Sequence, residues 1–162
     1  MSKKTRHAGI KRNDTFRDAM SAVIGENWGV LLETLPSGED LTDPEAIHKT
    51  RVASRRLRAA MDVSADAFPK PWYRHLHKVA KESTGAFGRV RDTDVQIEEL
   101  QALFAKSSGD EQLAIAWLIE ELQTERTQAL HDLQVYVDGL APRKLSKEVA
   151  DRFPTRKLRK KR

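Results

Sequence analysis

Residues 43–61 read DPEAIHKTRVASRRLRAAM, a stretch that joins a helix start to an amphipathic pattern. The Asp43 side chain can accept a hydrogen bond from a backbone amide of the first turn, and Pro44 lacks the amide hydrogen that the first helical position leaves without a partner. Glu45 adds a negative charge near the positive end of the helix. Apolar residues then recur at helical spacing on one side. The stretch predicts a helix from Pro44 to about Ala67.

The rest of the chain shows the same 3.6-residue pattern, with no convincing period of two residues that would indicate strands. Glycine, proline and serine interrupt the pattern where one helix should give way to the next. Helices joined by short loops pack most easily as antiparallel neighbours. We therefore predict an all-α fold, an antiparallel bundle of four to five main helices. The expected helices span about Asp14–Leu35, Pro44–Ala67, Pro71 to Gly85 or Gly88, Asp92 to a break at Ser107, and Asp110–Gly139.

A length of 162 residues suits one hydrophobic core, so one domain is expected. Residues 1–12 are basic and aperiodic and predict a flexible arm, residues 13–140 form the expected bundle, and residues 141–162 are expected to be a basic C-terminal tail with one or two further helical turns at most. The chain has no cysteine, no secretory leader pattern and no apolar run of about 20 residues. These features favour a cytoplasmic protein without membrane contact.

Charge is distributed unevenly along the chain. Between Glu45 and Arg91 there are eleven Lys or Arg residues and four carboxylates, whereas Asp92 to Glu125 holds nine carboxylates and one cation. The formal net charge of +5 is by itself only a mild indication of a polyanionic partner. Positive charge gathered into consecutive helical segments, however, is expected to present one electropositive surface.

The strongest cluster of charge lies at residues 48–58, where His48, Arg51, Arg55 and Arg58 fall within one arc of a helix. This ridge should extend roughly 15 Å at the standard helical rise. Like charges three and four residues apart repel, which costs an isolated helix a few tenths of a kcal/mol per pair. A phosphate-rich ligand would relieve that repulsion, and arginine suits it because the planar guanidinium donates two parallel hydrogen bonds to phosphate oxygens.

A second basic ridge is expected on the next helix, where Arg74, Lys78 and Lys81 are three and four residues apart. If it faces the first ridge, the two form a basic groove or cavity. A linear chain of phosphates fits such a groove because every monomer carries charge and no bases need to be read. Released counterions should then make the affinity fall steeply with added salt.

The run His48, Arg51, Val52, Arg55, Arg56, Leu57, Arg58, followed by GRVRDTDV at residues 88–95, resembles the CHAD domain, the conserved histidine alpha-helical domain. The likeness covers about residues 14–140. It implies a helical bundle with a basic cavity that binds inorganic polyphosphate, and an association with polyphosphate granules. It places the binding role on His48, Arg51, Arg55, Arg56, Arg58, Lys78 and Arg89, to which the residue pattern adds Arg74, Lys81 and Arg126.

In one respect the chain departs from that family. CHAD domains usually contain two similar helical halves, and this sequence ends where the second half would begin. Either one half suffices for binding, or two copies associate as a homodimer to complete the cavity.

Several of these residues also have purely structural interpretations. His48 can be a packed polar side chain, and Arg91 can pair with Asp92, which is expected to cap the following helix, or with Asp94. Arg126 lies on an apolar stripe, so it should point inward, either to complete the cavity or to pair with a carboxylate such as Glu33.

Other functional classes have weaker support. His75 and His77 should lie on different faces of a helix and no further ligand joins them at metal-binding spacing, so neither a metal nor another cofactor is expected. No P-loop is visible, and no carboxylates are placed to hold a divalent ion within the basic cluster, so the protein is not expected to be an enzyme. Non-specific nucleic-acid binding is the alternative function, supported by the basic ends and disfavoured by the absence of interleaved aromatic residues.

Overall fold

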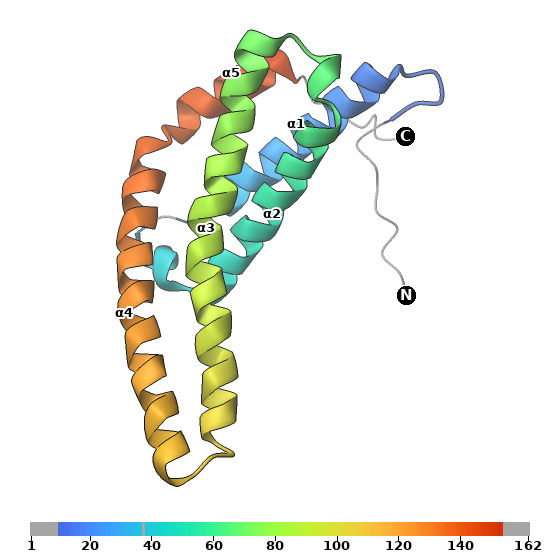
Figure 1. Cartoon of the computed structure of the whole chain (residues 1–162). Coiled ribbons are helices and arrows are strands. Elements are labelled where there is room, and N and C mark those ends of the chain that lie inside the picture. Colours follow the sequence, from blue (N-terminus) through green and yellow to red (C-terminus); the bar gives the residue numbers. More distant parts are fainter. Residues whose placement is uncertain (1–9, 37, 154–162) are drawn as a thin grey trace, which may run out of the picture. The chain divides into compact units, whose positions relative to one another are not determined.

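The computed structural model describes residues 10–36 and 38–153, and all the regular elements in those ranges are helices (Figure 1). The prediction of an all-α helical bundle is confirmed. The long predicted helix starting at Pro44 is present, although it ends at Val63 and a short 3₁₀ turn follows. The elements are α1 (Phe16–Thr34), η1 (Gly38–Thr42), α2 (Pro44–Val63), η2 (Ala65–Ala67), α3 (Lys70–Phe104), α4 (Gly109–Gly139) and α5 (Pro142–Arg152).

The described residues form two compact units. The first unit contains residues 10–34, 52–81 and 141–153, and therefore α1, most of α2, the beginning of α3, and α5. The second unit contains residues 35–51 and 82–140, which include η1, the start of α2, the rest of α3, and α4.

The core of the first unit is built by all four of its helices. Trp28, Leu57, Leu76 and Phe153 have no exposed surface. Helix α5 packs against α1, with its apolar positions turned inward. The segment expected as a basic tail therefore begins with a packed helix, because Leu145 and the residue one turn later have a core to enter. Residues 1–9 and 154–162, which make up most of the predicted arm and the end of the predicted tail, lie outside the described residues.

The second unit is organised around the hairpin of α3 and α4, which run side by side in opposite directions (Figure 1). Its core cluster consists of Leu41, Ile47, Phe87, Val90, Ala129 and Leu133. These residues come from η1, the start of α2, α3 and α4. The core thus ties η1 and the start of α2 to the hairpin.

The prediction of a helix break between Gly85 and Asp92 is wrong, since α3 continues through both positions. A glycine inside a helix costs about 1 kcal/mol relative to alanine, which does not by itself end a helix. Here Phe87 and Val90, on the same turns, are completely buried. Burial of two large apolar side chains stabilises by roughly 3–6 kcal/mol, so tertiary packing outweighs the local penalty.

Within residues 10–36 and 38–153, no helix combines the length and apolar composition that crossing a lipid bilayer would need.

Candidate functional site

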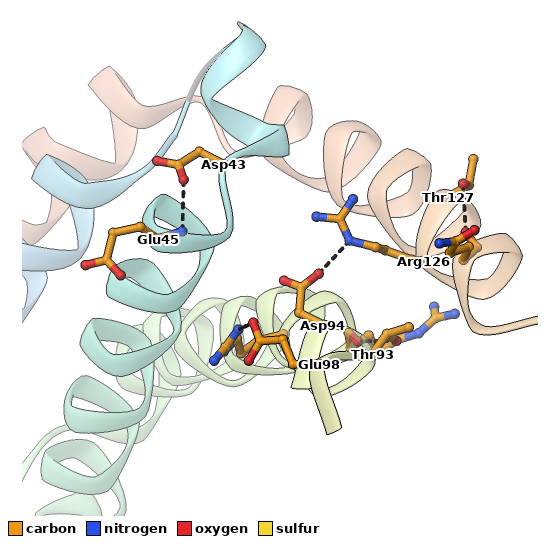
Figure 2. A network of polar contacts seen from close by, with 10 residues as sticks. Asp43, Glu45, Thr93, Asp94, Glu98, Arg126 and Thr127 are labelled. Atoms are coloured by element: carbon orange, nitrogen blue, oxygen red, sulfur yellow. Dashed lines mark hydrogen bonds and ion pairs between the residues drawn. The ribbon is translucent and has the colours of Figure 1, made fainter. Parts of the chain in front are cut away.

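The start of α2 is fixed by the interaction that its sequence predicts. Oδ1 of Asp43 accepts a hydrogen bond from the backbone amide of Glu45 at 3.0 Å (Figure 2). The cap holds the first turn of the helix whose outer surface carries the basic residues. On the opposite side, Ala53, Leu57 and Met61 are buried as their spacing predicts.

The middle of α2 presents two arginines to solvent. Arg55 and Arg56, together with Val52 and Ala59, line a shallow hollow of about 280 Å³. Both arginines are exposed, and no carboxylate among the described residues pairs with either of them. The hollow therefore combines an apolar floor with uncompensated positive charge.

Arg51 and Arg58, which flank Arg55 in the predicted ridge, differ from it because each has an acidic partner. Arg51 donates to Oδ1 of Asp92 at 2.7 Å, and its side chain is only 25% exposed. Nε of Arg58 lies 3.5 Å from Asp62 on the next turn of the same helix. Asp92 was predicted to cap a helix and instead binds Arg51, since α3 has no end at that position. His48 is exposed rather than packed.

Arg89 also has an acidic neighbour. It donates to Asp132 of α4 at 2.9 Å, and the same carboxylate accepts a hydrogen bond from Gln128 at 2.9 Å. The donation from Gln128 and then that from Arg89 lower the pKa of Asp132, because both stabilise its charged form. Arg89 lines a hollow that also contains Asp92 and Glu125, so the charge at this position is mixed.

Arg126 points inward, as its place on the apolar stripe predicts. Its Nε donates to Oδ1 of Asp94 at 2.5 Å, linking α4 to α3 (Figure 2). Asp94 is only 6% exposed, so Arg126 neutralises a buried carboxylate. Arg91 was predicted to pair with Asp92 or Asp94 and instead donates to Glu98 at 3.0 Å. Glu98 lies two helical turns after Arg91 on the continuous α3, within reach of a long side chain.

The N-terminal part of α3 carries the second predicted group of cations. Arg74 lines a hollow together with Lys70, Asp62, Asp66 and His77. Arg74 and Lys81 are exposed, and neither has an ion pair with a described residue, while Lys78 is exposed as well. This part of α3 therefore keeps more positive charge at the surface than the part that follows Glu82.

The two histidines of this segment lie on different faces, as predicted. Nε2 of His77 is 2.6 Å from Asp62, whereas His75 lies 3.6 Å from Glu148 of α5. No group of three or more histidine, aspartate or glutamate side chains suited to hold a metal ion occurs among residues 10–36 and 38–153.

The predicted site residues thus fall into two groups. Arg51, Arg89 and Arg126 each form an ion pair across two helices, with carboxylates 41, 43 and 32 residues away in sequence. Of the remaining cations, Arg55 and Arg56 line one hollow and Arg74 lines another, whereas Arg58 pairs with Asp62 on its own helix. The spacing of charges along the chain identified the arginines but not their acidic partners, because pairs this remote depend on which helices become neighbours.

In a comparison with protein families, the CHAD domain model matches residues 22–162. The chain belongs to the CHAD domain family. CHAD domains are associated with polyphosphate binding in general. The CHAD match extends through α5, in keeping with the packing of that helix against α1. Neither the curated proteins nor the solved structures include a match to the chain.

Proposed function

We propose that this CHAD domain binds inorganic polyphosphate, with Arg55 and Arg56 as its principal contacts. The observation that carries the proposal is the exposed pair of guanidinium groups on α2, at a hollow that no described carboxylate neutralises. Both guanidinium groups line the same hollow, and like charges held close together repel unless a counter-anion is present. A bound polyphosphate would supply that anion, and it would accept paired hydrogen bonds from each guanidinium.

The other exposed cations of the first unit extend this contact surface. Arg74, Lys78 and Lys81 are exposed on α3, and Arg58, which is partly exposed and paired with Asp62, lies on α2 with the principal pair. Each adds a charge that releases counterions when a phosphate chain binds.

Arg51, Arg89 and Arg126 have a different role in this proposal. Their guanidinium groups are already bound to Asp92, Asp132 and Asp94, so phosphate would have to displace a carboxylate to reach them. We assign them to holding the helices of the second unit in place. The polyphosphate surface is correspondingly smaller than the full set of basic residues.

The protein acts by binding alone, without a cofactor, in the cytoplasm and at polyphosphate granules. Incubating purified protein with polyphosphate and Mg²⁺ or Mn²⁺ tests the first point by measuring released phosphate. Release above the protein-free control, retained after further purification, would contradict it.

The binding site is tested with Arg55→Ala/Arg56→Ala. Each lost charge-assisted hydrogen bond is worth about 1.5–3 kcal/mol, so the double variant should lose at least about tenfold in affinity for long-chain polyphosphate by calorimetry. Arg143→Ala/Lys144→Ala is the matched control, because it removes the same charge from exposed positions of α5. An equal loss in both variants would show that net charge, and not the α2 surface, governs binding.

Competition separates polyphosphate from nucleic acid as the ligand. Long-chain polyphosphate should displace a bound single-stranded oligonucleotide at a much lower phosphate concentration than the oligonucleotide needs to displace polyphosphate. The reverse order would replace polyphosphate with nucleic acid in the proposal.

A further inference from the structure

The face of α4 that is turned away from the hairpin core carries large apolar side chains in contact with solvent. Leu113, Trp117 and Val135 are 70%, 60% and 61% exposed. The buried residues Ile115 and Leu133 lie on the opposite side of the same helix. Exposed tryptophan and leucine on one helical face are typical of a protein–protein contact, because binding a partner removes their apolar surface from water.

These apolar residues belong to a continuous line of positions along α4. Successive members are separated by four or three residues, so they remain within about 100° of the helix circumference. The pattern repeats after eleven residues, a period close to that of a straight helix. Every member is exposed. We call this line the outer stripe, and it consists of Leu113, Trp117, Glu120, Thr124, Gln128, His131 and Val135.

We propose that the outer stripe binds the same stripe of a second copy of this chain, with the two α4 helices antiparallel and Thr124 on the two-fold axis. In this register Leu113 of one copy meets Val135 of the other, so apolar side chains cover each other. Trp117 meets the imidazole of His131, and Glu120 lies opposite Gln128, whose amide donates to Asp132 within its own chain. All the positions come from one helix of one unit, so the interface needs no rearrangement of the fold.

Charge favours the antiparallel arrangement over the parallel one. A parallel pair would place Glu120 opposite Glu120, and the neighbouring Glu121 opposite Glu121. Like charges directly across an interface are unfavourable. In the antiparallel register Glu121 faces Thr127, which carries no charge.

The same matching identifies the partner as a second copy. An isologous interface requires that a patch be complementary to itself under a two-fold rotation. The outer stripe meets this condition at the two outer pairs on either side of Thr124, where Leu113 faces Val135 and Trp117 faces His131. Each copy contributes Leu113, Trp117 and Val135, so six large apolar side chains leave water in the dimer.

The inference does not depend on the proposed polyphosphate function, since no residue of the outer stripe belongs to the proposed binding surface.

Cysteine cross-linking tests the register, because the natural chain contains no cysteine. Under mild oxidation Thr124→Cys should form a covalent dimer rapidly, since position 124 faces itself across the axis. Gln123→Cys, an exposed neighbour outside the stripe, is the matched control and should react slowly. Leu113→Cys should also react slowly, whereas Leu113→Cys/Val135→Cys should cross-link. Rapid cross-linking of Leu113→Cys alone would establish a parallel pair and overturn the proposal, as would equal rates for positions 124 and 123.

Sedimentation of the full chain without polyphosphate tests association independently. We expect a monomer–dimer equilibrium that Trp117→Asp weakens by at least tenfold, with unchanged circular dichroism. Leu103→Asp is the control, because Leu103 is similarly exposed, at 46%, but lies on α3. A wild-type chain that stays monomeric, or equal weakening by both substitutions, would overturn the interface. Polyphosphate affinity measured for Trp117→Asp keeps this result separate from the proposed function, which places every contact outside the outer stripe and so predicts unchanged affinity.

Discussion

Replacing Arg126 with Met removes the positive partner of a buried carboxylate while keeping a side chain of similar length. Asp94 is 6% exposed, and its Oδ1 accepts the 2.5 Å hydrogen bond from Nε of Arg126. Its second oxygen, Oδ2, is buried and has no hydrogen-bond partner in the described residues. After the substitution, Asp94 is therefore a buried charge with nothing to balance it.

The expected cost follows from the burial of the two partners. Breaking a fully buried ion pair from one side costs about 3–5 kcal/mol. The Arg126 side chain is 23% exposed, so solvent already weakens the pair, and we expect a loss of about 2–3 kcal/mol. For a chain of this size, such a loss corresponds to a fall in Tm of roughly 5–10 °C.

Urea unfolding followed by circular dichroism measures the effect, with a double-mutant cycle as the control. Asp94→Asn should cost only about 1 kcal/mol, because a neutral amide replaces the charge and Arg126 keeps some contact with water. Adding Arg126→Met to Asp94→Asn should then cost less than it does in the wild type, by at least about 1 kcal/mol. An Arg126→Met loss below about 1 kcal/mol, or an equal loss in both backgrounds, would refute the argument. Polyphosphate affinity should be unchanged in the folded variant.

Two further predictions concern single interactions. Asp43→Ala removes the side-chain cap of α2 and should lower the free energy of unfolding, measured with urea, by about 1 kcal/mol. Asp43→Asn can still cap the helix and should retain most of the stability. Equal losses in the two variants would mean that the cap is unimportant. The phenol oxygen of Tyr136 lies 2.8 Å from the hydroxyl oxygen of Ser83, and burial raises the pKa of the phenol. The contribution of the neutral phenol to stability is therefore full below its unfolded pKa of about 10. It is lost as the pH rises through the folded pKa. The fall in Tm above about pH 10 should accordingly be shallower in Tyr136→Phe, and parallel Tm curves for variant and wild type would contradict this.

Local sequence signals predicted the start of α2 well and the course of α3 poorly. The Asp43–Pro44–Glu45 start depends on atoms within one helical turn, so the sequence alone contains the needed information. The continuity of α3 past Gly85 and Gly88 depends on what Phe87 and Val90 contact. Those contacts come from η1, α2 and α4, which no local pattern reveals.

The candidate site shows the same division. Helical spacing placed His48 and Arg55 on the exposed side of α2 and Leu57 in the core. It also predicted that Arg126 points inward. Spacing could not show that Arg51 is bound to Asp92, because the two are 41 residues apart and meet only when α2 packs against α3.

By itself, the sequence determined that this protein is helical, where its positive charge is concentrated, and which family it resembles. These properties follow from periodicity and residue type, which act over one or two turns of a helix. The tertiary structure alone decided which of the basic side chains pair with a carboxylate and which stand at the surface without an acidic partner. The physical reason is that an ion pair forms only where two oppositely charged side chains come within a few ångströms of each other, and that proximity depends on how the helices pack.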